Sequence, residues 1–226
     1  IYGDIQKCYL LKDAAINLSK AQQELKKINP DYSLLVADGA RPYHIQKLMW
    51  DSVKLSSEDR LKYLSNPKYG SVHNYGAAVD ITIVNKDGKE LDMGTPIDHF
   101  SELSFPILES YFLKQGKLSQ KQIDNRTLLR KVMSSAGYIN IPTEWWHFNA
   151  WYRRNVIKKY TLLDLNKTTA KPEIINAKAS ISFSIQLIIK SELIPITNKF
   201  FEEITVSYYQ QDGKYKYITG ICKDLS

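Results

Sequence analysis

The chain has 226 residues, of which 43% are hydrophobic and 24% are charged. These values are typical of globular proteins and exclude a disordered chain, a collagen-like repeat and a coiled coil, and no apolar run approaches the roughly 20 residues that cross a bilayer. The formal net charge of +7 favours an anionic neighbourhood such as cell-wall polymer, lipid headgroups or nucleic acid, without choosing among them.

The first 50 residues predict two helices with a strand between them. Apolar residues at helical spacing indicate a helix over residues 13–28, with Asp13 as its N-cap and Pro30 beyond its end. The run SLLVA at residues 33–37 is typical of a short buried strand. Residues 42–49 again have helical spacing.

A strand and a further helix are predicted in the middle of the chain. Residues 79–84 alternate apolar and polar side chains and are followed by Asn-Lys-Asp-Gly at residues 85–88, which predicts a hairpin and a partner strand. Residues 119–136 have helical spacing, and Gly137 suits a C-terminal cap. Helices mixed with antiparallel strands predict an α+β fold.

The composition changes near residue 160. All four histidines, all four tryptophans and every arginine precede this point. Residues 166–180 are polar, contain Pro172 and show no clear period, which indicates a linker. The sequence therefore predicts two domains, residues 1–165 and residues 181–226.

The predicted second domain is small and rich in strands. Residues 181–188 begin with strict alternation of apolar and polar side chains, as in a half-buried strand. Residues 204–209 and 214–218 flank Gln-Gln-Asp-Gly at residues 210–213, where Asp-Gly favours the tight turn of a hairpin.

Any metal site in this chain must use histidine and carboxylate ligands, because Cys8 and Cys222 lie at opposite ends and lack the close pairs of a zinc ribbon. His73 and Asp80 belong to the segment SVHNYGAAVD at residues 71–80, whose Gly-Ala-Ala lets the chain bend before the strand. This turn can direct both side chains at one site. A buried carboxylate at Asp80 would need a cation partner.

A second cluster, Glu-Trp-Trp-His, begins at Glu144 and follows Pro142. Glu144 and His147 are three residues apart and would point to opposite faces of a flat strand. We therefore expect Glu144 at a bend that enters the strand and His147 on the strand itself. A catalytic zinc takes three protein ligands and leaves one position open, with a separate carboxylate as general base. His73, Asp80 and His147 as ligands, with Glu144 as base, fit this pattern.

Arg41 is a third candidate, in the turn DGARP at residues 38–42. A rigid loop would present its guanidinium, whose fork of donors suits a developing oxyanion or a substrate carboxylate. The alternative is a structural arginine that pairs with an acidic neighbour.

Taken together, these motifs resemble the VanX-type D-alanyl-D-alanine dipeptidases over residues 1–160. The matching patterns, in chain order, are D-G-x-R-P at 38–42, S-x-H-x-x-G-x-A-x-D at 71–80, M-G-T-P-I-D at 93–98 and E-x-x-H at 144–147. The resemblance implies the zinc-peptidase fold shared with D-alanyl-D-alanine carboxypeptidases and the hedgehog signalling domain, with a central antiparallel sheet and flanking helices.

The resemblance also implies roles for individual residues. His73, Asp80 and His147 would hold zinc, and Glu144 would take the proton from the metal-bound water. Arg41 would stabilise the tetrahedral intermediate.

Three further residues are candidates for substrate contacts. By the resemblance, Asp98 would lie near the free ammonium of the substrate, although it could instead cap the following helix. Ser71 and Tyr75 are the other two. The sequence departs from the best-known dipeptidases at Val72, where they carry a second serine that helps bind the substrate amine, and at Ala40, where an aromatic residue is usual.

The C-terminal part is similar to SPOR-type peptidoglycan-binding modules, whose strands form a small sheet backed by helices. The similarity lies in FSIQL at residues 183–187, DGKYKY at 212–217 and TG at 219–220. Such modules usually continue with another helix and strand, so we expect the module at residues 181–226 to be incomplete as given.

The residues and the resemblance predict a zinc-dependent enzyme that hydrolyses D-Ala-D-Ala or a related wall-derived dipeptide. Two alternatives stay open: a D,D- or L,D-carboxypeptidase or endopeptidase acting on peptidoglycan stem peptides, and a non-catalytic, zinc-containing wall-binding protein. The expected partners are a small peptide and, through the C-terminal module, peptidoglycan, with no nucleic acid and no transmembrane segment. The expected location is the bacterial periplasm or cell envelope, with the cytoplasm as the alternative.

Overall fold

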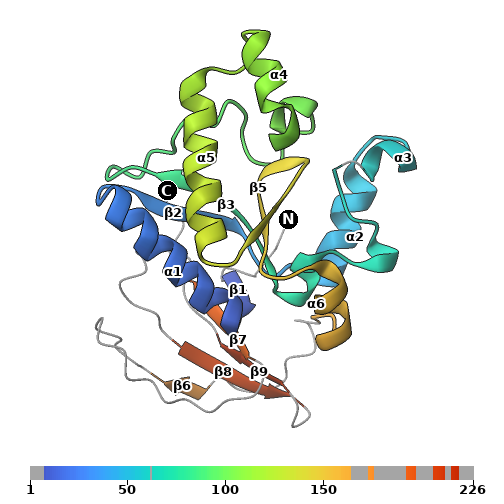
Figure 1. The fold of residues 1–226 in the computed structure, drawn as a ribbon. Helices are drawn as coiled ribbons and strands as arrows, with labels where there is room; N and C mark the ends of the chain where they lie inside the picture. Colours follow the sequence, from blue (N-terminus) through green and yellow to red (C-terminus); the bar gives the residue numbers. More distant parts are fainter. Residues whose placement is uncertain are drawn as a thin grey trace.

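The computed structural model describes residues 8–61, 63–163, 173–175, 192–196, 206–211 and 215–218. Two largely antiparallel sheets and several helices occupy these residues, which confirms the α+β class (Figure 1). The helical elements are α1 (Lys12–Ile28), α2 (Tyr43–Ser52), α3 (Ser57–Arg60), η1 (Pro67–Tyr69), η2 (Val72–Tyr75), η3 (Glu102–Ser104), η4 (Pro106–Leu108), α4 (Glu109–Lys114), α5 (Gln120–Ser135) and α6 (Arg153–Lys159). The strands are β1 (Cys8–Leu11), β2 (Ser33–Asp38), β3 (Ala78–Val84), β4 (Ile139–Ile141), β5 (Glu144–Asn149), β6 (Glu173–Ile175), β7 (Glu192–Ile196), β8 (Val206–Gln211) and β9 (Tyr215–Ile218).

The central sheet has the strand order β2-β3-β5-β4, with every pair antiparallel. Helices α1 and α5 lie side by side against this sheet (Figure 1). Leu18 and Leu25 of α1, Leu129 of α5, and Ile81 and Ile83 of β3 are fully buried in the layer between them. Burial of each such side chain stabilises the fold by about 1.5–3 kcal/mol, so the layer fixes β3 at the centre of the sheet.

Helix α1 confirms the predicted C-terminal end and corrects the predicted N-cap. The helix ends at Ile28, but it begins at Lys12, directly after β1, and Leu11 rather than Asp13 is the capping residue. Asp13 lies in the first turn, where a carboxylate interacts favourably with the positive end of the helix dipole. Ile28, the last residue of the helix, is 49% exposed.

The other two predicted helices form as expected. Helix α2 begins directly after Pro42, and α5 begins after Ser119, whose hydroxyl accepts a hydrogen bond from the backbone N–H of Gln122. Gly137 follows the C-cap of α5 with φ 88°, a conformation that favours glycine. None of the helices in the described part of the chain combines the length and apolar character needed to cross a bilayer.

The turn after β3 forms, but the partner strand predicted beyond it is wrong. Asn85 Oδ1 accepts hydrogen bonds from the backbone N–H groups of Asp87 and Lys89, which closes the turn. Only one bridge, between Val84 and Glu90, follows it. The chain then turns away, and the neighbours of β3 in the sheet are β2 and β5, which arrive from distant parts of the sequence.

A second sheet has the strand order β1-β7-β9-β8-β6 and lies below the central sheet in Figure 1. The predicted hairpin is confirmed: β8 and β9 pair antiparallel, with Tyr208 opposite Ile218 and Gln211 opposite Tyr215. Strand β1, from the start of the chain, pairs with β7, so the two ends of the sequence share this sheet.

The proposed division into two domains stays a prediction. Strand β6 lies inside residues 166–180, the segment for which the sequence suggests a linker. The strand predicted at residues 181–188 lies outside the described residues, as does the FSIQL segment on which the similarity to SPOR-type modules partly rests. That similarity therefore stays a prediction as well.

Candidate metal centre

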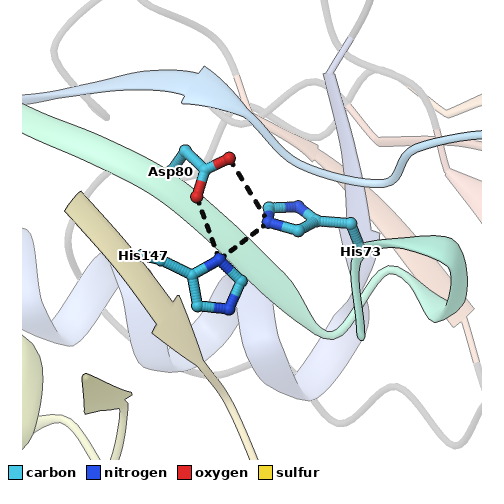
Figure 2. Close-up of side chains that lie close together, drawn as sticks. All are labelled: His73, Asp80 and His147. Atoms are coloured by element: carbon cyan, nitrogen blue, oxygen red, sulfur yellow. Dashed lines mark hydrogen bonds and ion pairs between the residues drawn. The ribbon is translucent and has the colours of Figure 1, made fainter. Parts of the chain in front are cut away.

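Three side chains from different elements converge on one point (Figure 2). Asp80 on β3 lies directly opposite His147 on β5 in the register of the two strands. Val79 and Ile81, the neighbours of Asp80, are fully buried in the core, so strand alternation turns Asp80 to the other face of the sheet. His73 enters from η2, immediately before β3.

The distances between the three candidate ligands fit a tetrahedral metal site. His147 Nδ1 lies 3.1 Å from His73 Nε2 and 3.1 Å from Asp80 Oδ1, and His73 Nε2 lies 3.3 Å from Asp80 Oδ2. Ligand atoms bound at about 2.0 Å in a tetrahedron lie about 3.3 Å apart. The described residues thus offer two nitrogens and a carboxylate at the separations that a zinc ion requires.

Hydrogen bonds on the far side of each imidazole orient the lone pairs toward the centre. His73 Nδ1 lies 2.7 Å from the carbonyl oxygen of Gly39 and donates to it, and His147 Nε2 donates to Asn149 Oδ1 at 3.0 Å. In the neutral imidazoles, His73 Nε2 and His147 Nδ1 are then both acceptors, and both face a carboxylate. Three acceptors without a donor between them form a site for a cation.

Close packing of backbone against backbone holds the carbonyl that orients His73. A Cβ atom at Gly39 would lie 2.5 Å from Cys8 Sγ and 2.8 Å from the carbonyl oxygen of Tyr9. Only glycine therefore allows β1 to approach this closely. The same close approach lets the backbone N–H of Ala40 donate a hydrogen bond to the carbonyl oxygen of Tyr9 at 2.7 Å.

Asp80 stays ionised in this site. In the metal-free site, burial by itself would raise the pKa of Asp80, but the charge of protonated His73 and hydrogen bonds donated by His147 and His73 together hold the pKa well below its usual value. Burial lowers the pKa of His73, but the charge of Asp80, the hydrogen bond to Asp80 and the charge of Asp38 together outweigh burial, so the pKa is raised. In the metal-free site, a proton on His73 therefore serves as the counterion of Asp80, and a cation bound by the neutral imidazoles would replace it.

An irregularity in β5 brings Glu144 to the same site as His147. Asn140 on β4 lies opposite Phe148, but the next residue, Ile141, lies opposite Glu144, so residues 145–147 have no opposite residue on β4. The Asn140 amide nitrogen spans this bulge and donates to the carbonyl oxygens of Glu144 at 2.9 Å and His147 at 2.8 Å. As a result, Glu144 Oε2 lies 3.7 Å from His147 Nδ1 although the two residues are an odd number apart.

Glu144 has the proton affinity of a base that works near neutral pH. Its side chain is 16% exposed, and burial raises its pKa from 4.5 to about 7, against the opposing charge of His147. A general base is most effective when its pKa lies near the pH at which the enzyme operates.

Arg41 is held rigidly beside the ligands. Its Nη2 lies 2.6 Å from Asp38 Oδ2 and 3.4 Å from Asp80 Oδ2, and its Nη1 donates to Gln46 Oε1 at 2.9 Å. Both sequence interpretations are thus compatible with the geometry: Arg41 pairs with acidic neighbours, and it also lines the cavity that contains the ligands.

Asp98 lies at the same cavity in a left-handed backbone conformation, with φ 59°. It does not cap a helix, because Ser101 precedes η3. The side chain of Asp98 is exposed at the cavity. Partial loss of solvent around its carboxyl raises the pKa of Asp98, and the negative charge of Asp80 raises it further. A carboxylate placed here is suited to bind an ammonium group.

A buried arginine fastens both ends of the loop that carries Asp98. Arg126 on α5 is fully buried, donates from Nε to the carbonyl oxygen of Met93 at 2.7 Å, and donates from Nη1 and Nη2 to that of Leu103 at 3.1 Å. The Trp145 indole N–H donates to Thr95 Oγ1 at 2.8 Å, which ties the same loop to β5. The loop is therefore connected to the strand that carries Glu144 and His147.

The three ligands border a cavity of about 440 Å³, within the size range of ligand-binding sites. Its charged and polar lining includes Arg41, Ser71, Asp98, Glu144 and Arg153. Ser71 lines the cavity and accepts a hydrogen bond from the His73 backbone N–H.

Tyr75 was expected to contact the substrate, but it does not line the cavity. Its side chain is 7% exposed and packs in the hydrophobic core. It lies two residues beyond His73 in η2, and at three residues per turn these side chains point in different directions.

Sequence reasoning also missed Asn140, Asn149 and Arg153. Asn149 lies two residues beyond His147 on β5, so strand alternation could have placed both on one face. Arg153 contacts residues 69 and 70, which lie far away in the sequence.

Comparison with known proteins gives one consistent result. The family model described as D-ala-D-ala dipeptidase matches residues 1–161. A D-alanyl-D-alanine dipeptidase of Synechocystis sp. is 30% identical over 170 residues, which cover 62% of this chain and 69% of the relative. The D-alanyl-D-alanine dipeptidase of Escherichia coli is 30% identical over 142 residues, which cover 63% of this chain and 66% of the relative. That of Enterococcus faecalis is 28% identical over 151 residues, which cover 61% of this chain and 70% of the relative.

Proposed function

The chain belongs to the D-Ala-D-Ala dipeptidase family of metal-dependent peptidases, and on this basis we propose that it hydrolyses D-Ala-D-Ala or a closely related dipeptide derived from the cell wall, with zinc as its metal. The observation that carries the proposal is the convergence of His73, Asp80 and His147 beside a carboxylate with a pKa near 7. A structural metal site would gain nothing from such a base, which disfavours a non-catalytic binding protein.

Zinc is the metal that best matches the three ligands. Two imidazole nitrogens and one carboxylate are typical of catalytic zinc sites, whose fourth position stays open. Mg²⁺ and Ca²⁺ prefer sites made of oxygen ligands. Bound by these residues, zinc would polarise the scissile carbonyl and lower the pKa of a water molecule.

The protein's own residues supply the remaining steps. Glu144 accepts a proton from the attacking water and delivers it to the leaving amine, which its pKa of about 7 allows at neutral pH. The Arg41 guanidinium, fixed by Asp38, faces the negative charge that develops on the carbonyl oxygen. Asp98 binds the ammonium group of the dipeptide and so aligns the peptide bond with Glu144.

An assay of three peptides in parallel tests the substrate. Zinc-loaded protein is incubated with D-Ala-D-Ala, L-Ala-D-Ala and a muropeptide, and the released amino acids are identified. Release of D-alanine from the free D,D-dipeptide is the expected result. Cleavage of the muropeptide alone would replace the proposal with a carboxypeptidase or endopeptidase acting on stem peptides.

A single substitution tests the assigned base. The variant Glu144→Gln should keep its zinc, because the three ligands are unchanged, and should lose nearly all turnover. Glu90→Gln, an exposed glutamate beyond the turn that follows β3, serves as the matched control and should retain full activity. A near-normal rate for Glu144→Gln would show that another group takes the proton.

We also propose that the protein works in the bacterial envelope. Support comes from the wall-derived substrate, from the sequence similarity of the C-terminal part to SPOR-type modules and from the net charge of +7. Cell fractionation and sedimentation with purified peptidoglycan test this location, and a protein found wholly in the cytosolic fraction that fails to sediment would contradict it.

A further inference from the structure

Arg153 stands out among the groups that line the cavity, and its role rests on the function proposed above. A free dipeptide is a zwitterion at neutral pH, with an ammonium group at one end and a carboxylate at the other. Both charges lose part of their water on entering the cavity, so an oppositely charged partner there strengthens binding. Asp98 suits the ammonium group, which leaves the carboxylate without an assigned partner.

The cavity offers two arginines, and they differ in the partners that they already have. Arg41 contacts the carboxylates of Asp38 and Asp80, so two negative charges surround its guanidinium. Arg153 donates from Nη2 to the carbonyl oxygens of Tyr69 and Gly70, at 2.5 Å and 3.1 Å, and these acceptors carry no net charge. Within the described ranges, no carboxylate lies at ion-pair distance from Arg153.

The two carbonyl contacts fix the guanidinium at the wall of the cavity. Arg153 is the first residue of α6, and Gly70 immediately precedes Ser71, which lines the same cavity beside His73. Within the part of the chain that the structure describes, Nε and Nη1 of Arg153 donate no hydrogen bond. Both groups can therefore donate hydrogen bonds to a carboxylate.

We propose that Arg153 binds the C-terminal carboxylate of the substrate and thereby restricts the enzyme to peptides with a free C-terminus. The two ends of the dipeptide are then held by opposite charges, Asp98 and Arg153, with the peptide bond between them near Glu144. A peptide whose C-terminus is amidated or extended by further residues places no charge at Arg153 and binds more weakly.

The competing explanation is a purely structural role, in which Arg153 only fastens α6 to the segment before Ser71. Two variants separate the roles. Arg153→Gln keeps an amide that can donate to the two carbonyl oxygens but removes the positive charge. Arg154→Gln removes the same charge from the next residue, whose guanidinium lies over the Tyr152 ring and does not line the cavity.

The experiment compares D-Ala-D-Ala with its C-terminal amide, using zinc-loaded wild-type protein and both variants. A charge-assisted hydrogen bond should make wild-type kcat/KM roughly 10–100-fold higher for the acid than for the amide. Arg153→Gln should reduce this ratio to near one, chiefly through a higher KM for the acid, whereas Arg154→Gln should keep it.

Two results would overturn the inference. An unchanged acid-to-amide ratio in Arg153→Gln, or an equal loss of kcat/KM for both peptides, would assign Arg153 a structural role while leaving the dipeptidase function intact. If the wild-type protein hydrolysed neither peptide, the proposed function would fail together with the role of Arg153.

Discussion

The raised pKa of Glu144 predicts that the catalytic base destabilises the metal-free protein. Burial of the carboxyl raises its pKa from 4.5 to about 7 in the folded chain, which corresponds to a free energy of about 3 kcal/mol. Replacement by glutamine removes the buried negative charge and keeps the shape of the side chain. At pH 8 we therefore expect Glu144→Gln to raise the free energy of unfolding by about 3 kcal/mol.

The destabilisation by Glu144 should depend on pH. Because the carboxyl of Glu144 has a higher pKa in the folded state, the folded protein binds the proton more tightly than the unfolded chain does. Below pH 4.5 both states are protonated and the destabilising effect is absent. The effect grows as the pH rises from 4.5 to about 7 and is fully present above that value. The stabilisation by Glu144→Gln should follow the same course.

Urea denaturation in the presence of a chelator, monitored by tryptophan fluorescence at pH 4 and pH 8, measures the stabilisation by Glu144→Gln and its dependence on pH. The exposed control Glu90→Gln should leave the free energy of unfolding nearly unchanged at both pH values. Equal effects of Glu144→Gln at pH 4 and pH 8, or a loss of stability at pH 8, would refute the reasoning, because the carboxylate would then not be penalised by burial.

Three further predictions concern residues that hold the site together. Asn140→Ala should release the bulge in β5 and lower kcat about 10–100-fold while zinc stays bound, as steady-state kinetics and elemental analysis would show, since Glu144 would be misplaced. Asn149→Ala should weaken zinc binding about 10–100-fold in a chelator competition, because it removes the acceptor that orients His147. Arg126→Met should lower the free energy of unfolding by about 3 kcal/mol in urea denaturation, because it removes the donor to the carbonyl oxygens of Met93 and Leu103. An unchanged value would mean that the loop beside α5 is held by other contacts.

The local parts of the fold and of the site could be read from the sequence. Helix α5 has its capping pattern at Ser119 and its glycine at 137, and β8 pairs with β9 as the sequence predicts, because both features depend on residues that are near one another in the sequence. The pair His73 and Asp80 lies on one turn and the strand that follows it, so the local bend is enough to bring the two side chains together.

The remaining features depend on contacts that no local pattern encodes. Strand alternation alone would place Glu144 and His147 on opposite faces, and the sequence predicted only that a bend must intervene; the contacts of Asn140 that hold the bulge could not be predicted. Tyr75 shares a motif with His73, yet the three-residue turn of η2 directs it into the core. Asn-Lys-Asp-Gly forms its turn, but β2 and β5 rather than the next segment become the neighbours of β3.

The most direct test of the metal centre is an anomalous difference map from crystals grown with one equivalent of zinc and recorded at the zinc absorption edge. We predict a single strong peak bonded to His73 Nε2, His147 Nδ1 and the Asp80 carboxylate, at about 2.0–2.2 Å from each. A peak at another place in the molecule, or coordination through His73 Nδ1 or His147 Nε2, would contradict the assigned ligands and the chemistry that depends on them.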